Sequence, residues 1–163
     1  MNRQRNLKLA AALLLLAVAA VAFGRLARQH RGGSDLAFFY DESEQRLFTG
    51  PRTAIPPIRG LNDAEPDAVR AVVISTNGNP RDRQARVIAY LERYSPELKR
   101  QMETAQTTGE APAMGRGMAQ AHRFVRRPHE SRWHPLTSEE GERIVNEWMT
   151  AGPGGQPAAI CTP

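Results

Sequence analysis

The first pattern along the chain is a long apolar run close to its start. Leu9–Phe23 contains fifteen consecutive apolar residues. As a helix, this run spans about 22 Å, against a hydrocarbon core of ~30 Å. If the helix continues to Ala27, it reaches about 28 Å, and Arg25 can extend its charge to the membrane interface. The pattern therefore predicts a single transmembrane helix, from Leu9 to Ala27, that anchors the chain to a membrane.

The same run also fits a cleaved signal peptide. Ala20-Val21-Ala22 has the small-x-small pattern of a signal peptidase site, and cleavage after Ala22 would release a secreted, periplasmic protein. A retained anchor is favoured because no Gly, Pro or Ser interrupts the helix before Ala22 and because an arginine cluster follows at once. Three basic residues lie on each side of the run, so the chain's amino group decides the orientation. We expect a single-pass inner (cytoplasmic) membrane protein with an exocytoplasmic C-terminal domain.

Alternating and β-branched patterns beyond residue 33 predict strands. The aromatic run Phe38–Tyr40 meets Leu47-Phe48 across the polar turn Asp41–Gln45, which is typical of a β-hairpin. Ala68–Thr76 is almost continuously apolar and β-branched, which favours a central strand. Gln84–Ser95 also alternates, and we interpret it as a strand with a helix as the competing interpretation.

Capping residues mark the starts of two helices. Ser95-Pro96-Glu97 combines a serine cap, a proline in the first turn and an acid, and this helix is expected to end near Thr107. Thr137, with Glu140 three residues later, forms a capping box. The apolar stripe of the helix that follows is Ile144, Val145, Trp148 and Met149. Between these elements, we expect an extended connection over 52–67, a flexible loop over 108–120 and an extended segment over 122–136.

These elements predict an α+β fold with a single N-terminal transmembrane helix, followed by a small antiparallel sheet with two short helices. We expect about four strands in the sheet. The expected parts are a signal-anchor segment with basic flanks (1–31), a small α+β domain (32–151) and an irregular Gly/Pro-rich tail (152–163).

The distribution of charge changes the meaning of the net charge of +5. Residues 1–31 carry six basic side chains and no acidic one, whereas the remaining residues carry 16 basic and 17 acidic side chains. The excess positive charge thus flanks the apolar run, where it acts on membrane topology. A nucleic-acid-binding domain needs that excess on its folded part, so we expect no nucleic acid as a partner.

One histidine cluster is a candidate metal site. His122, His129 and His134 lie within thirteen residues, but their spacings of seven and five match no metal-site motif. We interpret them as surface histidines and keep a small metal-binding or redox-associated domain, using the His122–His134 segment, as the alternative function. Cys161 is the single cysteine, so it has no partner for an internal disulfide.

The arginines of the same segment are a second candidate for binding. Arg123, Arg126, Arg127 and Arg132 have the chemistry to meet phosphates, but Glu130, Glu139, Glu140 and Glu142 lie nearby, which favours a salt-bridged face. The chain contains no G-x-S-x-G, H-E-x-x-H, P-loop or haem-attachment motif. We therefore expect no enzyme, no catalytic residue and no cofactor, and we favour an accessory or protein-binding role with an envelope protein partner.

Several stretches together resemble a known group of proteins. These are "FFYDESEQRLFTG" (38–50), "AIPPI" (54–58), "AVRAVVIS" (68–75), "IAYLERYSPELK" (88–99) and "WHPLTSEEG" (133–141). In this order they are similar to short, uncharacterised membrane-anchored proteins of planctomycete and verrucomicrobial bacteria. The resemblance implies a bacterial envelope location and no particular activity. Where that group often carries a CGxC-like turn, this chain has Ser75–Asn79, without thiols.

Overall fold

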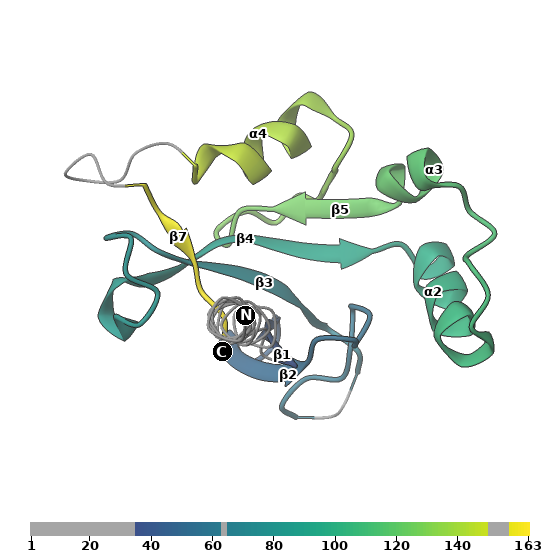
Figure 1. Cartoon of the computed structure of the whole chain (residues 1–163), viewed down its shortest axis with the longest axis horizontal. Helices are drawn as coiled ribbons and strands as arrows, with labels where there is room; N and C mark the ends of the chain where they lie inside the picture. The colour runs from purple at the N-terminus through teal and green to yellow at the C-terminus, as the bar shows by residue number, and fades with distance from the viewer. Residues whose placement is uncertain (1–34, 63–64, 150–156) are drawn as a thin grey trace, which may run out of the picture. The chain divides into compact units, whose positions relative to one another are not determined.

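The computed structural model describes residues 35–62, 65–149 and 157–163. In these residues seven strands form one antiparallel sheet in the order β2-β1-β3-β4-β5-β6, and β7 also pairs with β3 (Figure 1). The strands are β1 (Leu36–Asp41), β2 (Arg46–Pro51), β3 (Ala68–Ser75), β4 (Arg86–Tyr94), β5 (Arg123–Arg126), β6 (His134–Pro135) and β7 (Ala159–Ile160). The helices are α2 (Pro96–Thr108), α3 (Arg116–Ala121) and α4 (Glu139–Glu147), with a 3-10 turn, η1, at Arg83–Ala85. The α+β class with a small antiparallel sheet is therefore confirmed.

The predicted strands follow the hydrophobic pattern closely. In the β1–β2 hairpin, Phe39 pairs with Phe48 and Tyr40 with Leu47, as the aromatic run indicated. β3 lies inside the sheet, hydrogen-bonded to β1 and β7 on one side and to β4 on the other. The competing helical interpretation of Gln84–Ser95 is wrong, because Arg86–Tyr94 pairs along β3 and β5 as a strand.

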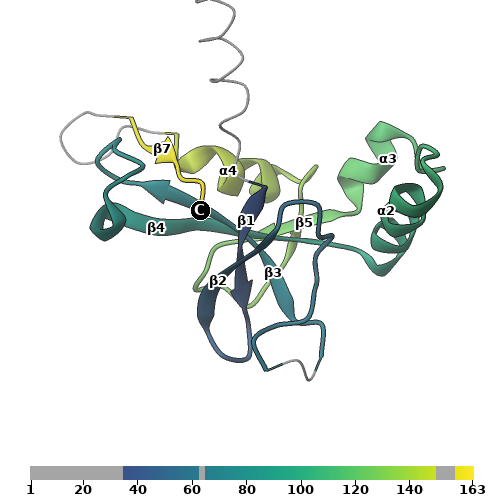
Figure 2. The ribbon, with the colours of Figure 1, turned by 60° about the horizontal axis from the view of Figure 1, so that its bottom comes forward.

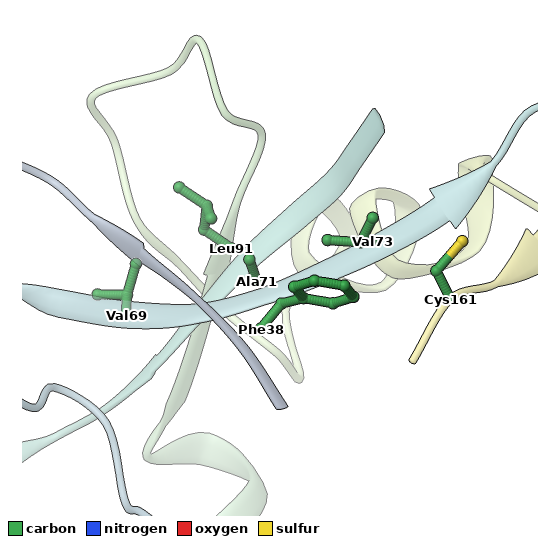
Figure 3. Close-up of a cluster of buried hydrophobic side chains, with 6 residues drawn as sticks. All are labelled: Phe38, Val69, Ala71, Val73, Leu91 and Cys161. Carbon is green, nitrogen blue, oxygen red and sulfur yellow. The ribbon is translucent and has the colours of Figure 1, made fainter. Parts of the chain in front are cut away.

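The main apolar cluster gathers side chains from three strands of the sheet and from the residue that follows β7. Figure 3 shows Phe38 of β1 and Leu91 of β4 with three side chains of β3, and Cys161 just after β7. The three β3 residues are Val69, Ala71 and Val73, which alternate along the strand and so share one face of the sheet. Tyr40, Ile88 and Trp133 pack against this cluster while remaining partly exposed.

Both predicted helices form, with one correction to their caps. The Ser95 hydroxyl accepts a hydrogen bond of 3.1 Å from the Leu98 amide and starts α2 as expected. In α4 the cap is Ser138 rather than Thr137, since the Ser138 hydroxyl accepts from the Gly141 amide at 3.1 Å. A Cβ at Gly141 would overlap the Pro135 carbonyl, so glycine allows α4 to approach β6 this closely.

Three other predictions are corrected by the structure. The segment 108–120 is not simply a loop, because it contains the start of α3. The tail beyond residue 152 is not wholly irregular: β7 pairs with Ile74 and Ser75, and the Cys161 amide donates to the Val73 carbonyl at 2.8 Å. In the described part of the chain, the sheet has seven strands rather than about four: β5 lies in the segment predicted only as extended, and β6 and β7 have two residues each, too few for a periodic signal.

The predicted membrane segment lies outside the described residues. Within the part of the chain that the structure describes, no helix combines the length and the apolar character needed to cross a bilayer. The predicted helix from Leu9 to Ala27 thus stays a prediction, as do cleavage after Ala22 and the 1–31 boundary.

A buried carboxylate fixes the turn of the β1–β2 hairpin. Asp41 is fully buried, and its Oδ1 accepts from the Glu44 amide and the Ser43 hydroxyl, each at 2.9 Å. Its Oδ2 accepts from the Leu61 amide at 2.6 Å, and a Cβ at Gly60 would collide with the same carboxylate. The Glu44 amide, with the other donors, lowers the pKa of Asp41 although burial opposes this change.

We expect Asp41→Asn to lower the free energy of unfolding by about 1–3 kcal/mol, because an amide nitrogen would face backbone donors. The pKa of Asp41 is lowered on folding. The ionised carboxylate therefore stabilises the fold at pH values above the usual pKa of an aspartate, and this effect is lost as the pH falls through the lowered pKa. Denaturant titrations followed by tryptophan fluorescence, at pH 7 and below about pH 4, measure both effects. Asp35→Asn, at an exposed position, is the matched control, and an equal effect of both substitutions would contradict the assignment.

Candidate binding groove between α2 and α3

The helices α2 and α3 lie next to each other at one end of the sheet (Figures 1 and 2). Residues of both helices line an apolar groove. We call it the α2–α3 groove. Its volume is about 450 Å³, and it is lined mainly by Leu98 and Met102 of α2, Met114 and Ala119 on the α3 side, and Tyr94 at the end of β4. A space of this size lies within the range of pockets that bind small molecules or single peptide side chains.

Hydrogen bonds between the end of β4 and the end of α3 set the width of the groove. The Ser95 amide donates to the His122 carbonyl at 2.9 Å, and Ser95 Oγ and His122 Nδ1 share a second hydrogen bond of 2.8 Å. On the opposite wall, the Met114 amide donates to Oε1 of Gln101 at 2.8 Å. The loop that precedes α3 is therefore tied to α2, and α3 is tied to the strand from which α2 begins.

An ion pair lies at the base of the groove. Arg123, at the start of β5, donates to Oε1 of Glu92 at 2.7–2.8 Å, and its guanidinium lies 6.0 Å from the centre of the Tyr94 ring. Glu92 is only 5% exposed, so its charge depends on this partner. Burial raises the pKa of the Tyr94 phenol, with Glu92 adding to the shift. The phenol is therefore neutral at physiological pH and has a hydroxyl to offer rather than a charge.

The chemistry of the groove favours apolar recognition. Met102 and Met114 are unbranched and polarizable, and such side chains adapt to differently shaped apolar partners. Ala119 adds a small side chain to the lining, while Arg116 and Gln120 provide polar groups. The arrangement can bind apolar side chains of a second molecule and orient them with a polar rim.

The structure does not bring the predicted histidines together. His122 caps α3 and bonds to Ser95, His129 is exposed, and His134 lies on β6 with its Nε2 4.0 Å from Oε2 of Glu130. In the described residues, no group of three or more His, Cys, Asp or Glu side chains is placed to hold a metal ion. The metal-binding alternative thus finds no supporting arrangement there, and His122 has a positioning contact instead.

Three of the four arginines of the 123–132 segment form ion pairs, whereas Arg132 is exposed and has no ion pair among the described residues. Arg127 binds Glu130, Glu140 and Glu147, with N–O distances of 2.7–2.9 Å. Arg126 binds Glu42 of the hairpin turn, and Arg123 binds Glu92. Three of these partners, Glu42, Glu92 and Glu147, were not among those that the sequence suggested, because strand pairing and the packing of α4 bring them near.

Sequence reasoning missed the groove itself. Its residues come from the end of β4, from α2 and from a segment predicted to be a loop, and no single periodic pattern spans all three. One feature of the sequence could have indicated the groove: residues 111–114 are uncharged and apolar, although the segment around them is rich in polar residues.

We expect Arg123→Gln to lower the free energy of unfolding by about 1–3 kcal/mol, since it leaves the buried carboxylate of Glu92 without its cationic partner. Arg132→Gln is the matched control, because Arg132 lies in the same segment and is exposed. That substitution should change stability by less than about 0.5 kcal/mol. Denaturant titration of the unmodified protein and of the two variants measures these differences. Equal stability of both variants would mean that the Glu92–Arg123 pair contributes little.

Comparison with protein-family models, with curated proteins and with solved structures finds no match for this chain. The resemblance to membrane-anchored proteins of planctomycete and verrucomicrobial bacteria therefore stays a prediction. Function must be inferred from the geometry of the groove and from the charges around it.

Proposed function

We propose that this chain is a membrane-anchored, protein-binding accessory domain of the bacterial envelope, and that its α2–α3 groove receives an apolar segment of the partner protein. The observation that carries the proposal is the groove itself, an apolar space of about 450 Å³ bounded by Met102, Met114 and Leu98. Apolar spaces with methionine walls suit the side chains of a peptide, because methionine adapts to several shapes.

The charge around the groove indicates the kind of segment it receives. Arg116 lies on the rim, is exposed and forms no ion pair within the described residues. Arg123 contributes a second guanidinium at the base, although Glu92 already neutralises it. A segment with apolar anchor residues and an acidic residue beside them complements this surface.

The anchor supports the same proposal. We propose that the Leu9 to Ala27 helix is retained and holds the domain on the exocytoplasmic side of the inner membrane. A tethered domain meets a membrane-bound partner at a high effective concentration, so a groove of modest size suffices for stable association. If the chain were cleaved after Ala22, the domain would be a secreted protein and would lack this advantage.

A photoreactive residue placed in the groove tests the binding proposal. We expect p-benzoylphenylalanine at Ala119 to cross-link in cells to a protein segment that is apolar with an acidic flank. The same residue at Met149, an exposed apolar position on α4's C-terminal side, should give no such product. Peptide mass spectrometry of the products identifies the segment.

A substitution in the groove provides the second measurement. Met102→Glu puts a charge into an apolar space and should reduce the Ala119 cross-link by at least about tenfold, whereas Met149→Glu should leave it unchanged. Near-UV circular dichroism of the purified variants verifies that the fold is retained. Cross-links of equal yield from both positions, or their survival in Met102→Glu, would contradict the proposed groove.

The mass of the protein extracted from its native membrane tests the anchor. We expect an intact mass that begins at Met1, because no Gly, Pro or Ser precedes Ala22 in the apolar run and an arginine cluster follows it. The measurement uses a C-terminal tag, mild detergent and native mass spectrometry, which also records a bound partner as additional mass. A mass that begins at Phe23 would establish cleavage and remove the anchor from the proposal.

A further inference from the structure

A second cavity lies where β4 ends and α2 begins, and we call it the Arg93 cavity. Its volume is about 450 Å³. The walls are largely apolar, formed by Pro57, Pro66, Pro96 and the Phe124 ring, while Arg93 and Lys99 supply the charged groups. Of the residues named for the α2–α3 groove, only Tyr94 borders both spaces.

The two cations of this cavity differ in how their charges are satisfied. Lys99 Nζ pairs with Oε1 of Glu103 at 3.1 Å and also donates to the carbonyls of Ile55 and Pro57. Its donors are therefore used inside the protein. The Arg93 backbone pairs with Phe124 in the sheet, but its side chain forms no hydrogen bond and no ion pair with any residue that the structure describes, so the five guanidinium N–H donors remain for another acceptor.

The position of the Arg93 guanidinium is fixed by stacking. It lies 4.5 Å from the centre of the Trp133 ring, and the Arg126 guanidinium lies 4.9 Å from the same centre. Arg126 has its own acceptors, namely Glu42 and the carbonyls of Arg127, Pro128 and Glu130. A guanidinium held over an aromatic ring keeps N–H groups available for a planar acceptor.

The surroundings of Arg93 favour an added negative charge. Burial lowers the pKa of Arg93 and the nearby Arg126 lowers it further, while Glu42 acts in the opposite direction. The carboxylate of Glu42 already binds Arg126, so one positive charge is left without a matching partner at this place. An anion with a single charge balances it.

We propose that the Arg93 cavity is a binding site for a small monoanionic carboxylate with an apolar body. The carboxylate makes paired hydrogen bonds with the edge of the Arg93 guanidinium, which matches its planar geometry. The apolar body packs against Phe124 and the three prolines. A phosphate dianion is disfavoured, because Lys99 is already neutralised and Arg93 alone supplies one charge. This inference is independent of the proposed protein-binding groove.

The probe for the test is 3-phenylpropionate, which combines one carboxylate with one aromatic ring. The full-length chain in detergent carries Trp148→Phe, which leaves Trp133 as its single tryptophan and as the reporter beside Arg93. We expect a saturable change in Trp133 fluorescence, with a dissociation constant in the range of about 0.1–10 mM. The neutral amide 3-phenylpropanamide should bind at least about tenfold more weakly, and the dianion phenylphosphate should bind no more tightly than the carboxylate.

Two arginine substitutions localise the binding. Arg93→Gln should weaken the binding of 3-phenylpropionate by at least about tenfold, because the charge-assisted hydrogen bonds are lost. Arg86→Gln is the matched control: Arg86 also lies on β4 and over an aromatic ring, Phe38 at 5.9 Å, but it donates to the Pro80 carbonyl and does not line the cavity. Its affinity should change by less than about twofold.

Four other outcomes would contradict the proposed binding site. They are the absence of a saturable change up to about 50 mM probe, equal affinity for the amide, tighter binding of phenylphosphate, or equal losses in the Arg93 and Arg86 variants. If Arg93→Gln fails to fold, Arg93→Lys decides, since it keeps the charge and removes the planar fork. Its affinity for the carboxylate should fall several-fold, and an unchanged affinity would contradict the proposal.

Discussion

The buried carboxylate of Glu92 is the constraint on which this end of the molecule depends. A charge that is 95% removed from solvent requires a partner of opposite sign, and Arg123 provides it across the β4–β5 pairing. Arg123 is the first residue of β5 and is separated from α3 only by the capping residue His122, so the ion pair fixes the strand that follows this helix. The same guanidinium lies over Tyr94, whose ring forms the base of the groove. Strand pairing, helix position and groove shape therefore share one electrostatic requirement.

Arginines connect the outer elements of the domain to its sheet. Arg126 joins β5 to the hairpin turn through Glu42, and Arg127 joins it to α4 through Glu140 and Glu147. Among the described residues, the apolar cluster on the sheet has six buried members, and these connections supply contacts that the cluster does not. These pairs contribute to stability to the extent that they are buried, since exposed ion pairs contribute little. Arg93 follows the opposite pattern: it is stacked on Trp133 as Arg126 is, but no acceptor among the described residues meets its edge.

Local patterns predicted the parts of the fold that local physics controls. The hairpin, Ala68–Ser75 and the start of α2 at Ser95 were predicted because aromatic pairing, β-branching and capping act over a few residues. The sequence could not reveal β7, which has two residues and exists only because β3 offers it an edge. The candidate site was not predicted either, because it also depends on contacts between distant residues: Glu92 and Arg123 are 31 residues apart and meet through strand pairing. The cap is Ser138 instead of Thr137, so a cap position predicted from a local motif can be wrong by one residue when two hydroxyl residues are adjacent.

The junction between β4 and α2 explains why two cavities adjoin each other. Successive residues of a strand point to opposite sides, so Arg93 and Tyr94 are directed to different sides of the sheet at the point where the strand ends. Beyond Tyr94 the chain turns at once into a capped helix, and the amide of Ser95 is held by the His122 carbonyl. The last two strand residues pair with Phe124 and Arg123 of β5 and still border open space at the end of the sheet. Rigid placement beside an unfilled volume is what a binding residue requires, and this junction provides it for a guanidinium and a phenol together.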